Sequence, residues 1–129
     1  MEVNEALDRD LVQTHGLSLN EYEVMVVLSE QPERRIRMSA LAEEIVNSRS
    51  RLTHTIRRME RRGLVSREAC ADDGRGVNCI LTDEGYAVLE RAAPDHVDSV
   101  RRNIFDNITA AEARSLGAIL GKLGESRHA

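Results

Sequence analysis

Two short amphipathic helices and a β-hairpin are predicted in direct succession between residues 39 and 82, and this succession narrows the possible folds most. Ser39 can cap the first helix. The apolar face of that helix consists of Leu41, Ala42 and Ile45. Asn47 or Ser48 can cap the second helix, which ends where Gly63 takes the position after a helix that glycine favours. Its inward residues are Leu52, Ile56 and Met59.

The hairpin is predicted from two apolar runs around an Asp-Gly turn signal. Its strands are expected over residues 64–70 and 77–82, with a turn over 71–76. A short edge strand is expected earlier, at 36–38. Two helices that meet near residues 45–48 and lead straight into a two-stranded ribbon form the plan of a winged helix-turn-helix, whose second helix enters the DNA major groove.

Helices are also predicted on both sides of this unit, so the expected fold is mainly α with a small β-hairpin wing. The first covers residues 3–14, and a capping box from Ser18 to Glu21 opens the next, which runs to about Ser29. Thr82 can cap a long helix over 83–106, kinked at Pro94. Its predicted apolar seam is Tyr86, Leu89, Ala93, Val97, Val100 and Ile104. A capping box at Thr109 opens the last helix, with its inward side predicted at Leu116, Ile119, Leu120 and Leu123.

The distribution of charge favours a nucleic-acid partner, although the net charge of −4 over 129 residues does not. Residues 34–67 hold ten arginines and three glutamates, a local charge of +7, and the rest of the chain carries −11. Aromatic residues make up only 2% of the chain, which disfavours modules that stack unpaired bases. The pattern therefore indicates double-stranded DNA read by arginines and hydroxyls.

The side chains for that contact are predicted on the second helix of the pair and on the hairpin tip. The outward face of the helix carries Ser50, Arg51, Thr53, His54 and Arg57, which suit phosphates and base edges. Arg75 lies between two glycines at the tip, where it can enter a narrow minor groove. Asp72 or Asp73 can hold its guanidinium by a bidentate pair.

Other functional classes find little support in the sequence. The four histidines have no metal-ligand spacing, no cofactor motif is present, and neither an enzyme nor a metal or cofactor site is predicted. No signal sequence or membrane span is visible, so a cytoplasmic location is expected. Cys70 and Cys79 are nearly symmetric about the hairpin turn, which places them opposite each other on the two strands. This arrangement leaves a redox switch at the base of the wing as one alternative.

Four stretches of the chain resemble the MarR family of winged-helix transcriptional regulators. Residues 16–24 are similar to the opening of the family's second helix, and 38–43 to the start of its helix-turn-helix. Residues 48–53 and 58–65 are similar to its recognition helix and exit. Residues 72–77 and 81–85 are similar to its wing signature, Asp-x-x-Arg followed by Leu-Thr-x-x-Gly. Arg57 stands where the family commonly has an acidic residue.

The resemblance implies one MarR-like domain over residues 1–129 that acts as a homodimer on a pseudo-palindromic operator. It assigns residues 17–85 to DNA binding, and 1–16 and 86–129 to dimerisation helices. It also implies a repressor that a small aromatic ligand releases from DNA. The predicted DNA-binding residues are Ser39, Ser48, Arg49, Ser50, Arg51, Thr53, His54, Arg57, Asp72 and Arg75. A winged helix that binds protein instead of DNA is the main alternative.

Overall fold

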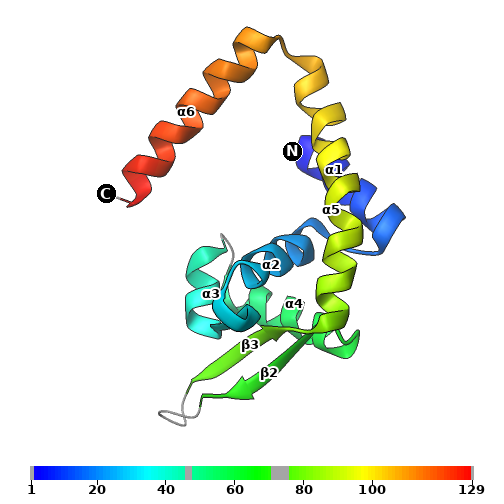
Figure 1. Cartoon of the computed structure of the whole chain (residues 1–129), viewed down its shortest axis with the longest axis vertical. Coiled ribbons are helices and arrows are strands. Elements are labelled where there is room, and N and C mark those ends of the chain that lie inside the picture. The colour runs from blue at the N-terminus through cyan, green and yellow to red at the C-terminus, as the bar shows by residue number, and fades with distance from the viewer. Residues whose placement is uncertain (1, 46–47, 71–75, 129) are drawn as a thin grey trace.

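In the computed structural model, which describes residues 2–45, 48–70 and 76–128, a helix-turn-helix and a small sheet lie beneath a long helical arch (Figure 1). The helices are α1 (Glu2–His15), α2 (Leu19–Ser29), α3 (Met38–Glu44), α4 (Arg49–Arg61), α5 (Asp83–Asn103) and α6 (Ala110–His128). The strands are β1 (Arg35–Arg37), β2 (Val65–Ala69) and β3 (Val77–Leu81). Short 3-10 turns cover Pro32–Arg34 and Phe105–Asn107. The predicted mainly helical fold with a hairpin wing is confirmed.

The sheet has the order β1-β3-β2 and is antiparallel throughout. β1 is therefore an edge strand, as predicted, one residue earlier in the chain than expected. The strand follows α2 in the chain and pairs with β3 at the base of the wing, with Ile36 opposite Cys79. The hairpin is closed by a 2.8 Å hydrogen bond that the Cys70 amide donates to the Gly76 carbonyl.

The hydrophobic core lies between α2, α3, α4, the sheet and the first half of α5. Its fully buried members include Leu17, Met25, Leu28, Leu41, Ile56 and Met59. These residues come from every element of the helix-turn-helix, and the last two share one side of α4. The orientation of α4 relative to the wing is thus set by apolar packing and not by its surface charges.

Most of the predicted helix caps are confirmed. Ser18 and Glu21 form a reciprocal capping box, and Thr82 accepts the Gly85 amide at 3.0 Å. The Thr109 capping box forms as well. The prediction for Ser39 is wrong, because α3 begins at Met38 with Arg37 as its N-cap and no side-chain cap bond. Strand pairing continues through Arg37, so the chain turns into the helix before Ser39 is reached.

The predicted apolar seam of α5 is only partly correct. Leu89 is buried as expected, but Val97 is 53% exposed. The other buried positions of the helix are Gly85, Ala92 and Ser99, and Ser99 faces α1. α1 presents an acidic side chain to that face, Asp10, and the serine of α5 turns inward to donate to it. α5 runs as one helix through Pro94.

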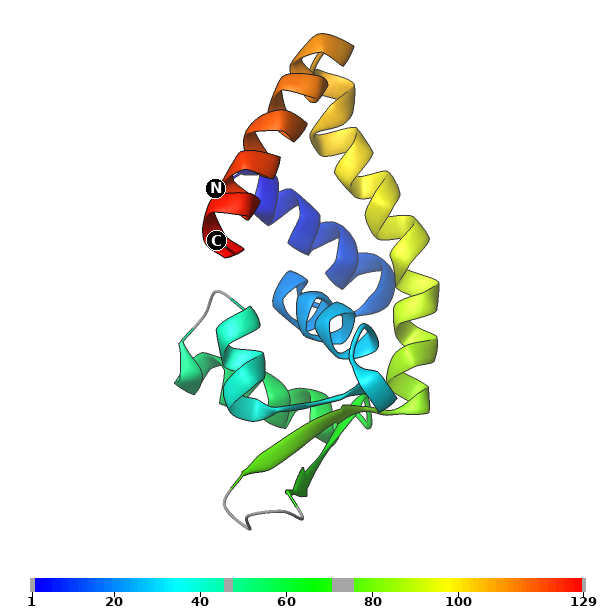
Figure 2. The same ribbon diagram turned by 60° about the vertical axis from the view of Figure 1, so that its left-hand side comes forward.

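The arch is formed by α5, which rises from the sheet, and α6, which descends on the other side of the molecule (Figures 1 and 2). The prediction that the apolar residues of α6 face inward is wrong for a single chain. Leu116, Ile119, Leu120 and Leu123 are between 36% and 62% exposed, because α6 stands apart from the body of the chain after the turn at Phe105–Asn107 (Figure 1). Within the described residues, no helix is long and apolar enough to cross a membrane.

Candidate nucleic-acid interface

Helix α4 presents a polar face to solvent on the side opposite the core. Ser48 starts it by accepting the Arg51 amide at 3.2 Å, so it is Ser48, one of the two caps that the sequence allows, that forms the cap. Gly63 follows its end with φ of 76°, a conformation that glycine adopts without strain. The side chains buried beneath α4 are Leu52, Thr55, Ile56 and Met59. These side chains fall on one side of successive turns, so the opposite side of the helix faces solvent.

The structure places most predicted contact residues on this exposed face. The exposed residues are Ser48, Arg49, Ser50, Arg51, His54 and Arg57. Thr53 is half-buried, and its hydroxyl donates to the Arg49 carbonyl at 2.9 Å. The Thr53 oxygen keeps its ability to accept a hydrogen bond, so it can still take part in a base contact.

Ser39 and Thr53 line one groove between the start of α3, the side of α4 and the base of the wing. The groove encloses about 440 Å³, and Arg37, Arg67 and Gly76 complete its polar rim. Arg37 and Arg67 are not among the predicted site residues. Both belong to the arginine-rich segment, but their position at this groove depends on how β1 and β2 pair with β3.

Arg67 holds α4 to the wing. Its guanidinium makes two hydrogen bonds to the Glu60 carboxylate, at 2.9 and 3.3 Å. These bonds hold the pKa of Glu60 below its ordinary value, and they raise that of Arg67. Because Glu60 belongs to α4 and Arg67 to β2, the pair fixes the angle between the candidate reading helix and the hairpin.

The arginines of residues 34–67, the positive segment, fall into two groups: those paired with carboxylates of the described residues and those that are not. Four of its arginines meet acidic partners within the chain: Arg34 with Asp83, Arg35 with Glu33 and Glu68, Arg62 with Glu21, and Arg67 with Glu60. Arg34 also stacks on the Tyr86 ring at 3.7 Å. On α4, by contrast, Arg49, Arg51, Arg57, Arg58 and Arg61 form no ion pair with any residue that the structure describes. The charge available to a polyanion is thus concentrated on α4.

The predicted contacts at the wing tip, Asp72 and Arg75, lie outside the described residues. The two strands on either side of the tip are described, and β2 and β3 extend away from the helical body (Figure 1).

The prediction that Cys70 and Cys79 lie opposite each other is wrong. Cys79 pairs with Arg67, whereas the backbone of Cys70 bonds to Gly76. The backbone partner of Cys70 lies three positions before Cys79, so the two cysteines are offset by about 10 Å along the ribbon. Cys79 is fully buried, and burial raises the pKa of its thiol to about 12. Both cysteines are free thiols.

A second site is a cavity of about 870 Å³ between α1, α2 and α5. Its apolar wall includes Leu7, Leu19, Val26, Val27 and Ile45. The rings of Tyr22 and His96 lie 4.4 Å apart at its border. No pattern in the sequence distinguished these residues from an ordinary core, because their grouping depends on how three helices cross.

The first turn of α2 joins this cavity to α4. Asp8 of α1 lines the cavity and accepts the Leu19 amide at 2.8 Å. Two residues further on, Glu21 is buried and lies 3.4 Å from the guanidinium of Arg62, the C-cap of α4. The cavity wall and the end of the candidate reading helix are thus both in contact with the first turn of α2.

Within the described residues, no group of three His, Cys, Asp or Glu side chains is placed to hold a metal ion. The polar clusters are occupied by internal hydrogen bonds and ion pairs instead. The features that remain for function are the exposed face of α4, the groove at the base of the wing, and the α1–α2–α5 cavity.

Comparison with known proteins gives consistent matches. A family model described as MarR family matches residues 17–77. The chain is 30% identical over 122 residues to the HTH-type transcriptional regulator PecS of Dickeya dadantii (strain 3937). This match covers 94% of this chain and 72% of PecS. It is 35% identical over 107 residues to the transcriptional regulator HosA of Escherichia coli, spanning 83% of this chain and 77% of HosA.

Solved structures show the same likeness. Sco3205, a MarR family transcriptional regulator from Streptomyces coelicolor in complex with DNA, superimposes with a TM-score of 0.88 at 45% identity. That match covers 97% of this chain and 78% of Sco3205. AbsC, a MarR family regulator from the same organism, superimposes with a TM-score of 0.85 at 40% identity and covers 98% of this chain and 85% of AbsC.

Proposed function

This chain belongs to the MarR family of transcriptional regulators, not to a family of enzymes, and from this premise we propose that it is a sequence-specific repressor that binds double-stranded DNA. The observation that carries the proposal is the exposed face of α4. There, hydroxyls and arginines without acidic partners among the described residues stand on a helix that the core holds rigidly. Such a protein works in the cytoplasm, with the chromosomal DNA.

The proposed DNA contacts follow from this placement. α4 enters the major groove, where Ser50, Thr53 and His54 meet base edges and Arg49, Arg51 and Arg57 meet phosphates or guanines. Ser39 meets a phosphate from the groove at the base of the wing. Arg75, supported by Asp72, enters the adjacent minor groove. Residues 17–85 form the DNA-binding part in this proposal.

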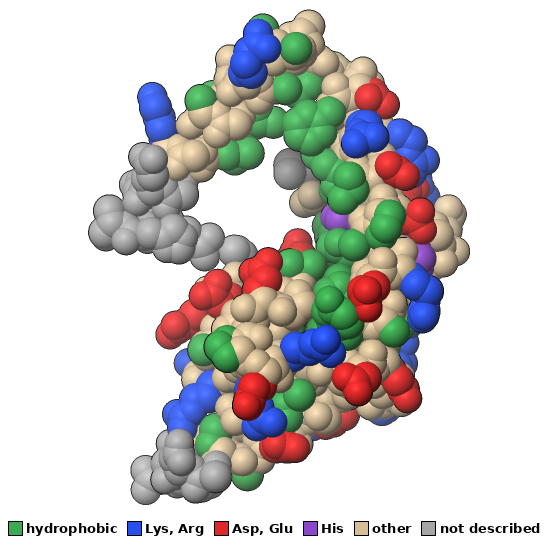
Figure 3. All heavy atoms as spheres, in the orientation of Figure 1, with side chains coloured by type: hydrophobic (Ala, Val, Ile, Leu, Met, Phe, Trp, Pro, Cys, Tyr) green, Lys and Arg blue, Asp and Glu red, His purple; other side chains and the backbone are tan. Residues whose placement is uncertain are grey.

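We assign residues 1–16 and 86–129 to dimerisation. The exposed apolar side chains of α6 support this assignment, because four of them share a helix that leaves the body of its own chain. Figure 3 shows hydrophobic side chains along the inner side of the arch made by α5 and α6. A second copy would cover them, and the resulting two-fold dimer would present two α4 helices to the two halves of a pseudo-palindromic operator.

Release from DNA by a small ligand is the regulatory part of the proposal. The α1–α2–α5 cavity lies between the proposed dimerisation and DNA-binding parts, and the α2 turn links it to Arg62 at the end of α4. A ligand that moves α1 against α2 would change the distance between the two α4 helices of a dimer. Such a change lowers operator affinity because both half-sites must be met at once.

The test of DNA binding is selection of bound duplexes from a random pool, followed by gel-shift titration of the selected operator at several salt concentrations. We expect a pseudo-palindrome and binding that weakens steeply with salt. Arg75→Ala should lower affinity and reduce the salt slope by about one unit. Substitution of Ser50 or Thr53 should change base preference more than overall affinity. Arg91→Ala, on the solvent side of α5, serves as the matched control.

Two results would overturn the proposal. The absence of salt-sensitive binding to any duplex would favour the alternative of a winged helix that binds another protein. Equal losses on all sequences for the Ser50 and Thr53 variants would show that these side chains do not read bases. The redox alternative is not favoured by the hairpin register, which separates Cys70 from Cys79.

A further inference from the structure

We infer that the ligand of the α1–α2–α5 cavity is an organic cation, an amine or related positively charged group on an apolar body. The inference deepens the proposed ligand response and rests on it. The proposed function leaves the charge of the ligand open, and the present inference specifies that the charge is positive. Three features of the cavity lining carry the inference: an acidic rim, a pair of rings and an apolar wall.

The cavity is acidic at its rim. Four carboxylates line it: Glu5 and Asp8 from α1, Glu23 from α2 and Glu44 from α3. No lysine or arginine is among the described residues that line it. An anionic ligand would enter against like charges, which disfavours binding, whereas a cation would meet charges of the opposite sign.

These carboxylates are not neutralised within the described part of the chain. Glu5, Glu23 and Glu44 are exposed and form no ion pair there. Asp8 accepts the Leu19 amide at 2.8 Å, which holds its carboxylate at the wall without cancelling its charge. Partial loss of solvent around Glu23 raises the pKa of its carboxyl group, and no cationic neighbour among the described residues lowers it.

The ring pair at the border suits the same ligand class. Tyr22 and His96 both line the cavity, and their ring centroids are 4.4 Å apart with planes tilted by 46°. An aromatic face attracts an ammonium group, and carboxylates nearby strengthen the attraction. Loss of solvent lowers the pKa of His96, so the imidazole is neutral at pH 7 and adds no positive charge. Its Nδ1 is buried without a partner among the described residues.

The apolar wall requires that the cation carry a hydrophobic body. Leu7, Val26 and Val27 supply apolar lining beside the carboxylates, and the cavity volume of about 870 Å³ far exceeds that of an ammonium ion. A bare metal ion does not fit, because no group of three His, Cys, Asp or Glu among the described residues is placed to ligate one. An amphiphilic organic cation satisfies both surfaces.

The experiment compares three probes that share one ring system and differ in charge: 1-naphthylmethylammonium, 1-naphthalenemethanol and 1-naphthoate. Dissociation constants are measured with the full chain by naphthalene fluorescence, and release from the selected operator is followed in parallel. A partly exposed ion pair changes affinity by roughly two- to fivefold. With four carboxylates, we expect the cation to bind at least about tenfold more tightly than the anion, with the alcohol between them.

Variants locate the effect. Glu23→Gln and Glu5→Gln should each reduce the ratio of the affinity for the cation to the affinity for the anion by roughly two- to fivefold. Both should leave the affinity for the alcohol unchanged. Glu90→Gln, an exposed position on α5 outside the cavity, is the matched control and should change nothing. Val27→Trp should fill the cavity and weaken all three probes. The residues of the cavity do not contact DNA in the proposed function. The operator affinity of this variant in the absence of probe therefore reports whether it is folded.

The failures are distinguishable. Equal or tighter binding of naphthoate, or a ratio that the two glutamate variants leave unchanged, overturns the inferred charge while leaving the ligand site in place. No binding of any probe overturns the cavity as the ligand site, and with it the inference. If operator binding itself is absent, the proposed function fails first, and the salt titration above shows it independently.

Discussion

At the residue scale, a glycine at the start of α5 explains the second half of the wing signature. The Thr82 hydroxyl donates to the carbonyls of Gly63 and Leu64, at 2.6 and 3.0 Å, and accepts the Gly85 amide. This brings the first turn of α5 against the backbone that follows α4. A Cβ on Gly85 would overlap with the Leu64 carbonyl oxygen and the Leu81 side chain. The Leu-Thr-x-x-Gly pattern is therefore a packing requirement.

Gly85→Ala is expected to destabilise the protein by about 2 kcal/mol or more, because a backbone carbonyl cannot move aside as a flexible side chain can. Urea unfolding at a fixed protein concentration measures the change. Gly117→Ala in α6 is the matched control. An added Cβ there meets nothing within 4 Å in the chain. Alanine is also favoured over glycine inside a helix, because glycine loses more backbone conformational entropy on folding. A Gly85→Ala protein as stable as its parent would contradict this account of the signature.

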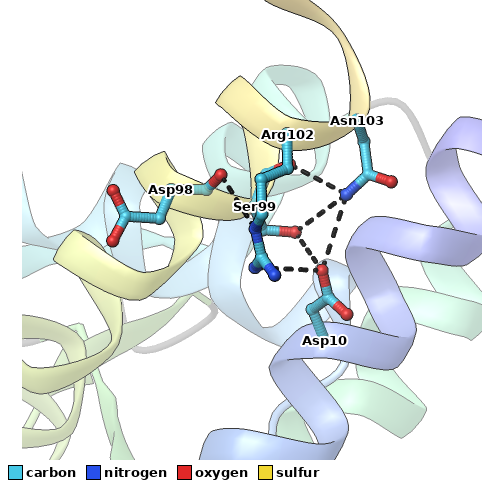
Figure 4. A network of polar contacts seen from close by, with 5 residues as sticks. All are labelled: Asp10, Asp98, Ser99, Arg102 and Asn103. Carbon is cyan, nitrogen blue, oxygen red and sulfur yellow. Dashed lines mark hydrogen bonds and ion pairs between the residues drawn. The ribbon is translucent and has the colours of Figure 1, made fainter. Parts of the chain in front are cut away.

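At the element scale, a polar network joins α1 to α5 (Figure 4). Asp10 accepts a 2.6 Å hydrogen bond from the buried Ser99 hydroxyl, and the side chains of Arg102 and Asn103 approach the same carboxylate at 3.5 Å. The hydrogen bond from Ser99, followed by the charges of Arg102 and Arg9, holds the pKa of Asp10 below its ordinary value. The two helices are thus joined by directional polar contacts where an apolar seam was predicted.

Ser99→Ala should lower the free energy of unfolding by about 1–2 kcal/mol at pH 7, the usual cost of losing a hydrogen bond to a charged group. Because the pKa of Asp10 is lowered on folding, its contribution is present above its ordinary pKa near 4 and is lost as pH falls through the lowered value. The difference between parent and variant should therefore shrink toward pH 3. Unfolding curves at pH 7 and pH 3 test this, with the exposed Ser115→Ala as control.

The register of the hairpin makes a separate prediction about its cysteines. With Cys79 buried opposite Arg67 and its thiol pKa near 12, the native protein should not be alkylated at this position at pH 8. Mild oxidant should not link Cys70 to Cys79, and it should leave operator binding of the parent and of Cys70→Ser alike. Mass spectrometry of trapped thiols gives the answer. A linked pair in the folded protein would show that the hairpin register differs from the one described.

At the scale of the whole molecule, the arch separates the apolar surface of α6 from the helix-turn-helix. Figure 3 shows the open space that α5 and α6 enclose with the body, and the hydrophobic side chains that border it. Side chains such as Ile119 and Leu120, 55% and 57% exposed, are costly to leave in water. A single chain cannot cover them, so the proposed dimer accounts for their presence.

Leu120→Glu is expected to shift the protein from dimer to monomer, because a carboxylate would be buried without a partner in the proposed interface. Light scattering coupled to size-exclusion chromatography measures the mass. The operator affinity of the monomer should fall by roughly a hundredfold or more, since one chain meets one half-site. Arg114→Glu, on the opposite side of α6, should remain dimeric. A Leu120→Glu protein that stays dimeric would remove α6 from the interface.

Local signals in the sequence predicted much of the fold and of α4. Capping residues such as Ser18, Ser48 and Thr82 act within three residues of themselves, so their effect does not depend on distant parts of the chain. The spacing of apolar residues on α4 likewise determines which side is buried. The exposure of Ser50 and Arg57 follows directly, and the structure has it as predicted.

Only the tertiary structure decided which face of α5 is buried, which arginines remain available, and where α6 points. Each depends on a partner that is remote in sequence. Ser99, and not Val97, is buried because it donates a hydrogen bond to Asp10, while Glu21 and Glu60 form ion pairs with two arginines of the positive segment. The wing register and the acidic cavity arise in the same way, from strands and helices that cross. The sequence by itself therefore determined the elements and the reading helix, because those are set by near neighbours, while packing between distant segments decided the charges and surfaces left for ligands.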